Sequence, residues 1–130
     1  MKKFLKFSIL FTIILSLNLL NIVQRASAIG KVDWLLLKEN DDGKEWVDLA
    51  SIKKINNNEI SVLTKYFQNP SKENFKGETN LYLMRINCDN REFKDISVNG
   101  IPSFKATWKN SNNDELIDVV IEKSCNEINS

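Results

Sequence analysis

Cys88 and Cys125 are the only two cysteines of this 130-residue chain, and their side chains offer the clearest chemistry. A pair of thiols can form a disulfide, bind a metal or supply a nucleophile. The chain contains no histidine, so zinc sites and catalytic pairs that combine cysteine with histidine are absent. A disulfide between Cys88 and Cys125 is therefore the prediction, and it requires an oxidising compartment.

Carboxylates gather near one turn, at Asp41, Asp42, Glu45 and Asp48. Their spacing differs from that of a calcium loop, so we interpret them as a solvated hairpin turn. The serines have no histidine partner, and no glycine-rich phosphate loop is present. We predict no catalytic residue, no metal site and no cofactor, although chemistry carried by carboxylates alone stays open.

The N-terminus has the pattern of a signal peptide. Lys2, Lys3 and Lys6 precede an apolar run over residues 7–23, and Ala26-Ser27-Ala28 supplies small residues for cleavage. We predict a signal peptide over residues 1–28, cleaved after Ala28, and one domain over residues 29–130. The alternative is a retained membrane anchor, since 17 residues lie at the lower limit for a spanning helix. The protein is expected to be exported, either to the periplasm or as a secreted protein.

The charge of the predicted mature chain disfavours nucleic acid as a partner. Cleavage removes Lys2, Lys3, Lys6 and Arg25, which leaves 14 of the 18 basic residues against 17 acidic ones, a net charge of −3. Phosphate binding needs a basic surface. A domain of this size has a modest core, so a disulfide contributes usefully to its stability.

Alternating apolar residues and turn signals predict an antiparallel sheet. Residues 33–49 form a hairpin around Asp41-Asp42-Gly43, residues 59–67 and 79–88 form two strands, and residues 68–78 form a long loop between them. Residues 91–98 and 101–109 pair through an Asn99-Gly100 turn. The predicted fold is α+β, with an antiparallel sheet of about five to six strands, a C-terminal helix packed on it, and one disulfide.

A helix is expected from Asp114 to Cys125, with Asn112 or Asn113 as its N-cap, followed by a frayed tail over residues 126–130. Its apolar residues recur at helical spacing and place Cys125 on or near the buried side. In the strand of residues 79–88, Cys88 shares a face with Met84 and Ile86. Both sulfurs are thus expected to face the core.

Aromatic side chains are the remaining candidates for binding. Trp34 and Trp108 are expected in the core, because a large apolar side chain in a small domain is usually buried. Trp46 and Tyr66 fit the core and the surface equally well, and we take them as candidate surface binding residues.

The assembled pattern resembles the surface-adhesin protein E-like family of exported bacterial domains. The resemblance rests on Trp34, Trp46-Val47-Asp48 followed by Ser51-Ile52, the strand Ile60-Ser61-Val62, Cys88, and Trp108 before a helix that ends at Cys125. It implies an antiparallel sheet with a C-terminal helix and a Cys88–Cys125 disulfide. The family's named member is an outer-surface protein that binds host matrix and serum proteins. This chain lacks a lipoprotein cysteine, and no host-binding segment can be matched, so no binding residue is carried over.

The sequence therefore favours a non-catalytic, adhesin-like module that binds protein at the cell envelope, through sheet edges or the loop of residues 68–78. An exposed edge strand could also pair two copies into a homodimer. Contact with a membrane is expected only through the signal peptide. The alternatives are a structural envelope protein and a small hydrolase or an inhibitor of one.

Overall fold

The computed structural model describes residues 30–129, and the predicted signal peptide lies outside them. The chain divides into two compact units, Met1–Gly30 and Lys31–Ser130, and the fold described below is that of the second. Within residues 30–129, no helix is long and apolar enough to span a membrane.

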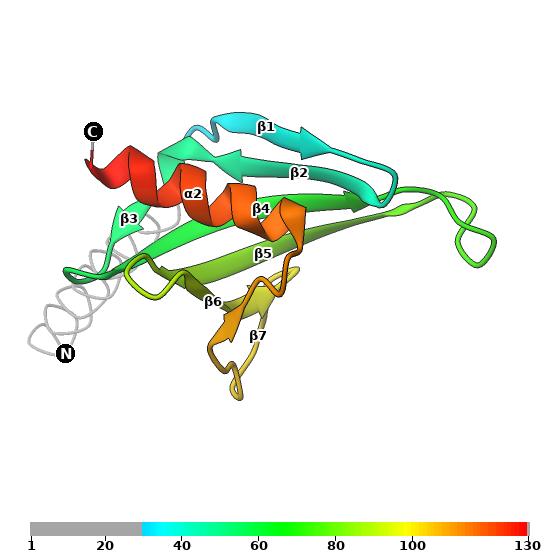
Figure 1. The fold of residues 1–130 in the computed structure, drawn as a ribbon. Coiled ribbons are helices and arrows are strands. Elements are labelled where there is room, and N and C mark those ends of the chain that lie inside the picture. The colour runs from blue at the N-terminus through cyan, green and yellow to red at the C-terminus, as the bar shows by residue number, and fades with distance from the viewer. Residues whose placement is uncertain (1–29, 130) are drawn as a thin grey trace, which may run out of the picture. The chain divides into compact units, whose positions relative to one another are not determined.

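An eight-stranded sheet, antiparallel throughout, forms most of this unit (Figure 1). Five strands are long: β1 (Trp34–Glu39), β2 (Gly43–Asp48), β4 (Glu59–Gln68), β5 (Glu78–Asn87) and β6 (Glu92–Val98). Three have two residues each: β3 (Lys53–Lys54), β7 (Ile101–Pro102) and β8 (Lys109–Asn110). The order is β1-β2-β4-β5-β6-β7, with β3 beside β4 and β8 beside β6. The predicted antiparallel sheet is confirmed.

The hairpins follow from local turn chemistry. Asn40 starts the β1–β2 turn, where its side chain accepts hydrogen bonds from the backbone N–H groups of Asp42 and Gly43. Asn99 adopts a positive φ of 50° and Gly100 one of 79°, as the predicted two-residue turn between β6 and β7 requires. A short 3₁₀ helix, η2 (Leu49–Ser51), connects β2 to β3.

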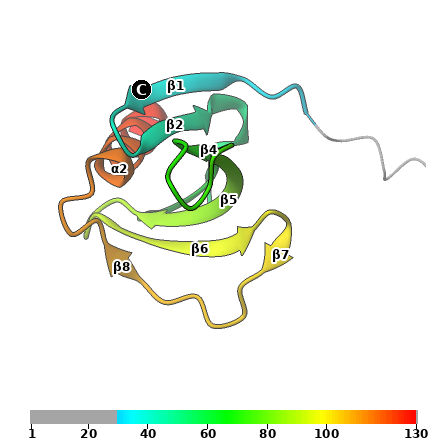
Figure 2. The ribbon, with the colours of Figure 1, turned by 90° about the vertical axis from the view of Figure 1, so that its right-hand side faces the viewer.

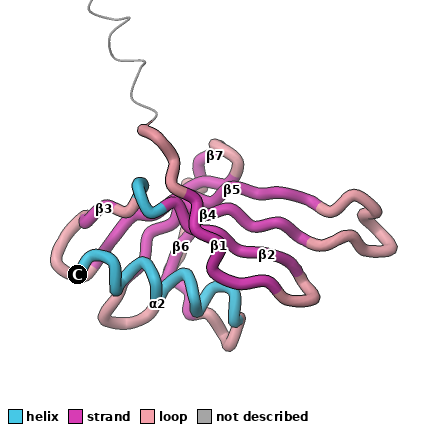
Figure 3. Tube along the Cα trace, turned by 90° about the horizontal axis from the view of Figure 1, so that it is seen from above, coloured by secondary structure: helices cyan, strands magenta, loops and turns pink. Residues whose placement is uncertain are grey.

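The C-terminal helix α2 (Glu115–Asn129) lies along one face of the curled sheet (Figures 2 and 3). Its N-cap is Asp114, whose side chain accepts hydrogen bonds from the N–H groups of Leu116 and Ile117. The predicted caps, Asn112 and Asn113, instead form the preceding turn with positive φ angles of 51° and 68°. The frayed tail is also a wrong prediction, because the helix continues to Asn129.

The core lies between α2 and the inner face of the sheet, which we define as the face that α2 covers. Its buried members are Val47, Ile60, Val62, Met84, Ile86, Phe93, Val120 and Ile121. Cys88 and Cys125 pack at its margin and are bonded, with an S–S distance of 2.03 Å and Cα atoms 5.8 Å apart. The predicted disulfide is confirmed, and it fastens the C-terminal half of α2 to the end of β5.

The strand expected over residues 101–109 is largely wrong. Within this stretch only β7 and the first residue of β8 are strand, both paired with β6, and residues 103–108 form a loop between them. The pairing with β6 ends at Ser103, whose N–H donates to the Ile96 carbonyl at 2.7 Å, and the chain then turns, with Ala106 N–H donating to the Ser103 carbonyl at 3.3 Å. Phe104, expected on an ordered strand face, is 95% exposed in this loop.

Helix α2 is shorter than the strands that it covers. Ten-residue strands such as β4 and β5 extend over about 33 Å, whereas a 15-residue helix extends over about 22 Å. The disulfide holds α2 at the Ile60 and Ile86 end of these strands. The opposite end of the inner face, beyond the N-terminus of α2, is therefore left without a helix above it.

Candidate functional site

A cleft of about 750 Å³ occupies this uncovered end of the inner face. Its floor comes from β2, β4, β5 and β6, and one wall comes from the turn and first residues of α2. We call it the inner cleft and define it by Glu45, Thr64, Tyr66, Tyr82, Asp95 and Asp114. Its position follows from the difference in length between the helix and the strands.

Glu45 is the most unusual side chain of the inner cleft. It is only 3% exposed, and Val47 and Gly43 flank it on the same face of β2. Burial raises its pKa from 4.5 to about 8, the nearby Asp114 and Asp95 add to the rise, and a hydrogen bond with the Thr64 hydroxyl works against it. At neutral pH most Glu45 side chains are protonated.

Three of the other four carboxylates of the cleft have partners, and Glu115 pairs with Lys38. Asp114 caps α2, and Asp95 lies 3.8 Å from Lys109 Nζ. Burial raises the pKa of Asp95, while Lys109 lowers it. Lys109 is the only cationic side chain that lines the cleft within the described residues, against five carboxylates: Asp42, Glu45, Asp95, Asp114 and Glu115. The cleft is acidic even with Glu45 neutral.

Two tyrosines complete the polar lining. Tyr66 lies across from Glu45 in the β2–β4 pairing, and its hydroxyl donates to the Asp42 carbonyl at 3.1 Å. Its ring packs where Gly43 has no side chain, since a Cβ there would lie 2.7 Å from Tyr66 Cε2. Burial raises the pKa of Tyr66 and that of Tyr82. Both phenols therefore remain neutral donors near pH 7.

Glu45 is a residue that sequence reasoning missed. The expected solvated turn holds for Asp41 and Asp42, which are exposed, but is wrong for Glu45 and Asp48. Asp48 has a structural role, because it accepts hydrogen bonds from the N–H groups of Asp33 and Ala50. The signal for Glu45 was its alternation with Val47, which places both side chains on the buried face of one strand.

The outer face of the sheet, opposite α2, has a different character. One row of paired residues crosses four strands: Leu36 of β1, Trp46 of β2, Lys65 of β4 and Leu81 of β5. Lys65 Nζ lies 4.3 Å from the ring centroid of Trp46 and 4.9 Å from that of Trp34. Leu36 and Leu81 remain 45% and 39% exposed. We call these four residues the outer row.

All three tryptophans of the chain contact lysines of the outer face. Lys94, next to the buried Phe93 on β6, points outward, and its Nζ lies 4.2 Å from the centroid of Trp108. Trp34 and Trp108 are only partly buried and lie outside the core cluster, so their predicted place in the core is wrong. Lysine side chains shield these rings where the sheet has no second layer.

The structure separates the two candidate binding residues. Trp46 pairs with Lys65 and belongs to the outer row, whereas the next residue of β4, Tyr66, faces the inner cleft. Strand alternation puts them on opposite faces, so they cannot form one site. Whether either residue binds a partner stays a prediction.

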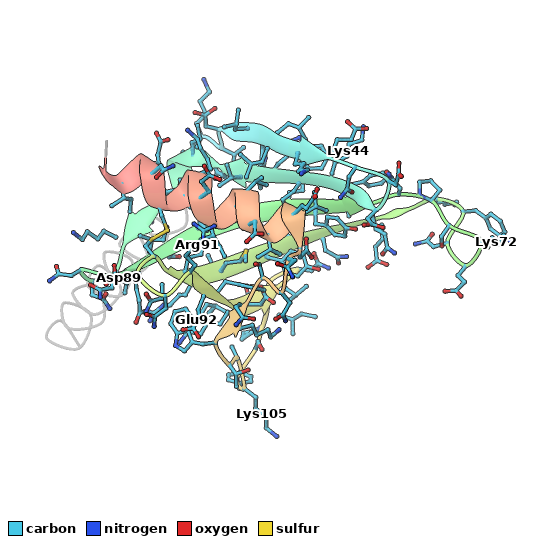
Figure 4. All side chains as sticks on the ribbon, in the orientation of Figure 1. Lys44, Lys72, Asp89, Arg91, Glu92 and Lys105 are labelled. Atoms are coloured by element: carbon cyan, nitrogen blue, oxygen red, sulfur yellow. A yellow bond between two sulfur atoms is a disulfide. The ribbon has the colours of Figure 1, made fainter. Side chains whose placement is uncertain are left out.

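Two loops project away from the sheet. Lys72 marks the loop of residues 69–77, and Lys105 marks the loop between β7 and β8, at different ends of the unit (Figure 4). Each loop carries a highly exposed aromatic ring, Phe75 at 83% and Phe104 at 95%. Within residues 30–129, no group of three or more cysteine or carboxylate side chains is arranged to hold a metal ion.

Comparison with known proteins identifies the family of this chain. The model of the surface adhesin-E family matches residues 35–130, which include every strand except the first residue of β1, and the whole of α2. The chain belongs to the surface adhesin-E family. It has no significant match among curated proteins or among solved structures. Membership of the surface adhesin-E family supports an adhesin-like role and an exported or surface location.

Proposed function

We propose that this protein is an exported, non-catalytic binding module that holds a protein partner at the cell envelope through the outer row. Family membership supports the adhesin-like part of the proposal, and the disulfide suits an oxidising compartment. Cleavage of residues 1–28 as a signal peptide, and a final location in the periplasm or outside the cell, belong to the same proposal.

The observation that carries the proposal is the composition of the outer row. Tryptophan and apolar side chains, surrounded by a polar rim, are typical of the centres of protein interfaces. Trp46 is held in place by Lys65, and exposed Leu36 and Leu81 lie at the two ends of the row. A rigid aromatic ring loses little conformational entropy when a partner covers it.

Charge indicates the kind of partner. Lys44, Lys65, Arg85 and Lys94 all point to the outer face, where Lys44 pairs with Glu39 and Arg85 with Glu59, while Lys65 and Lys94 lie over tryptophan rings. A protein with an apolar patch bordered by carboxylates would be complementary to this surface. A second copy of the chain carries the same cations and is therefore less well matched. Within residues 30–129, β1 is an edge strand that pairs only with β2, so strand pairing between two copies is the other route to a dimer.

The hydrolase alternative would have to use the inner cleft, which contains several carboxylates. General acid–base chemistry needs one carboxyl group held neutral and another free to act on the substrate. Glu45 meets the first condition, but Asp95 pairs with Lys109 and Asp114 caps α2. These engagements favour binding over catalysis.

Site-specific photocrosslinking tests the proposal in the cell that exports the protein. A benzophenone amino acid in place of Leu81 is expected to form a crosslink to one protein, and the added substitution Trp46→Ala is expected to abolish it. The same probe in place of Glu122, on the exposed side of α2, is the matched control. Equal crosslinking at both positions, or none at position 81, would refute the outer row as the binding surface.

A further inference from the structure

The inner cleft contains a buried acid without a cation beside it. Glu45 is 97% shielded from solvent, and among residues 30–129 the hydrogen-bond partner of its carboxyl group is the Thr64 hydroxyl, which also lies 3.5 Å from Met84 Sδ. No basic side chain among residues 30–129 forms an ion pair with it. A buried carboxyl group of this kind stays neutral or acquires a positive partner. In the protein without a ligand, a bound proton neutralises the Glu45 carboxyl group.

The surroundings of Glu45 select the kind of cation. No set of side chains in the described part of the chain is arranged for a metal ion, and the excess of carboxylates repels anions. Met84, Phe93 and Leu116 give the same cleft an apolar part. A volume of about 750 Å³ is that of a small-molecule site. The lining thus suits a positive group on an aliphatic stem.

We propose that the inner cleft binds the ammonium group of an alkylamine at Glu45, with the aliphatic stem against Met84, Phe93 and Leu116. On binding, the O–H bond of the Glu45 carboxyl group breaks, its proton leaves to solvent, and the carboxylate pairs with R–NH₃⁺. Tyr66 and Tyr82 supply further oxygen atoms near the ammonium group. This site is distinct from the outer row and does not depend on the proposed function.

Other titrating and charged groups face the same space and affect the exchange of proton for cation. They are Asp42 from the β1–β2 turn, Tyr66 from β4, Tyr82 from β5, Asp95 from β6, Lys109 from β8, and Asp114 and Glu115 from the start of α2. The acidic members favour a cation over a neutral ligand. Lys109 is directed to Asp95, so it does not compete for Glu45.

Calorimetry with the purified exported protein tests the proposal. The probe is 1,5-diaminopentane, and the matched neutral probe is 1,5-pentanediol, which has the same stem. At pH 7 the diamine is expected to bind at least tenfold more tightly than the diol. Titrations in buffers of different ionisation enthalpy are expected to show about one proton released per diamine bound.

Variants assign the effect to Glu45. Glu45→Gln is expected to weaken diamine binding at least tenfold and to abolish proton release, while Glu122→Gln, outside the cleft, should bind as the wild type does. If Glu45→Gln does not fold, Asp95→Asn at the same cleft takes its place, with weaker binding expected. Diamine binding no tighter than diol binding, or unchanged in the variant that folds, would overturn the proposal.

A capped Ala-Lys-Ala peptide distinguishes two sources of the amine. Binding of the peptide, with or without the diamine, supports a lysine side chain of a partner as the natural ligand. Binding of the diamine alone supports a free alkylamine. Binding of neither contradicts the site, and crosslinking at Leu81 is then expected to persist, because the outer row lies on the other face.

Discussion

Glu45 of β2 and Tyr66 of β4 are directly paired across the two strands, and both side chains line the inner cleft. One β-ladder therefore places a carboxyl group and a phenol on the same face without any loop. A site built on paired strands is held more firmly than one built on loops. Because the β2–β4 pairing buries Glu45, unfolding the protein changes the pKa of its carboxyl group, and this change can be measured.

The first prediction concerns pH. Folded Glu45 keeps its proton up to about pH 8, whereas the unfolded chain releases it near 4.5. The folded state binds more protons between these values, so the free energy of unfolding falls as pH rises through this window, by up to roughly 1.4 kcal/mol per pH unit. Urea denaturation at several pH values measures this dependence of the free energy of unfolding on pH. Glu45→Gln should flatten the dependence, leaving the smaller contribution of Asp95, which has the same sign.

The second prediction concerns the disulfide, which spans 37 residues. Loss of the disulfide in Cys88→Ala/Cys125→Ala should lower the free energy of unfolding by about 4 kcal/mol, because the unfolded chain is no longer constrained. Urea denaturation of the wild type with and without reductant should reproduce the difference. Thiol titration of the unfolded, non-reduced protein should find no free thiol, and finding two would contradict the bond.

The third prediction concerns Ser124, whose buried hydroxyl has no hydrogen-bond partner among residues 30–129. An unsatisfied buried hydroxyl costs about 1–3 kcal/mol. Ser124→Ala should therefore raise the free energy of unfolding by about 1 kcal/mol, after the small loss of packing. Thermal denaturation measures the change, and a lower melting temperature would show that the hydroxyl is satisfied in solution.

The fourth prediction concerns Gly43. A Cβ at this position would lie 2.2 Å from the Phe67 carbonyl oxygen and 2.7 Å from the Tyr66 ring. Gly43→Ala should separate β2 from β4 and cost about 1–3 kcal/mol of stability. Gly30→Ala is the matched control, since no atom lies within 4 Å of its added Cβ. Equal melting temperatures for the two variants would contradict the close approach.

The sequence predicted the long strands and the helix because each depends on a local pattern, and it predicted the disulfide because the chain has only two cysteines. Alternation in β4 and β5, the Asn99-Gly100 turn and the apolar stripe of α2 are visible without tertiary information. The loop of residues 103–108 was missed because its alternating aromatics resemble a strand. The turn that begins at Ser103 ends the strand in spite of that pattern.

The candidate sites depend on long-range geometry and were harder to predict. Glu45 looks like one of several turn carboxylates until the sheet and α2 close around it. Trp34 and Trp108 look like core residues, but Trp34 lies beside Lys65 on the outer face and Trp108 lies in a loop beside Lys94.

Alternation along β4 also limits how this protein can change during evolution. Lys65 contributes to the outer row and Tyr66 to the inner cleft, so insertion or deletion of one residue within the strand would exchange the two surfaces. A substitution in β2 or β4 alters either the outer row or the inner cleft, whereas a change in the length of either strand disrupts both surfaces. The loop of residues 69–77 has no such constraint, so relatives are expected to differ in length there and to keep these strands at constant length.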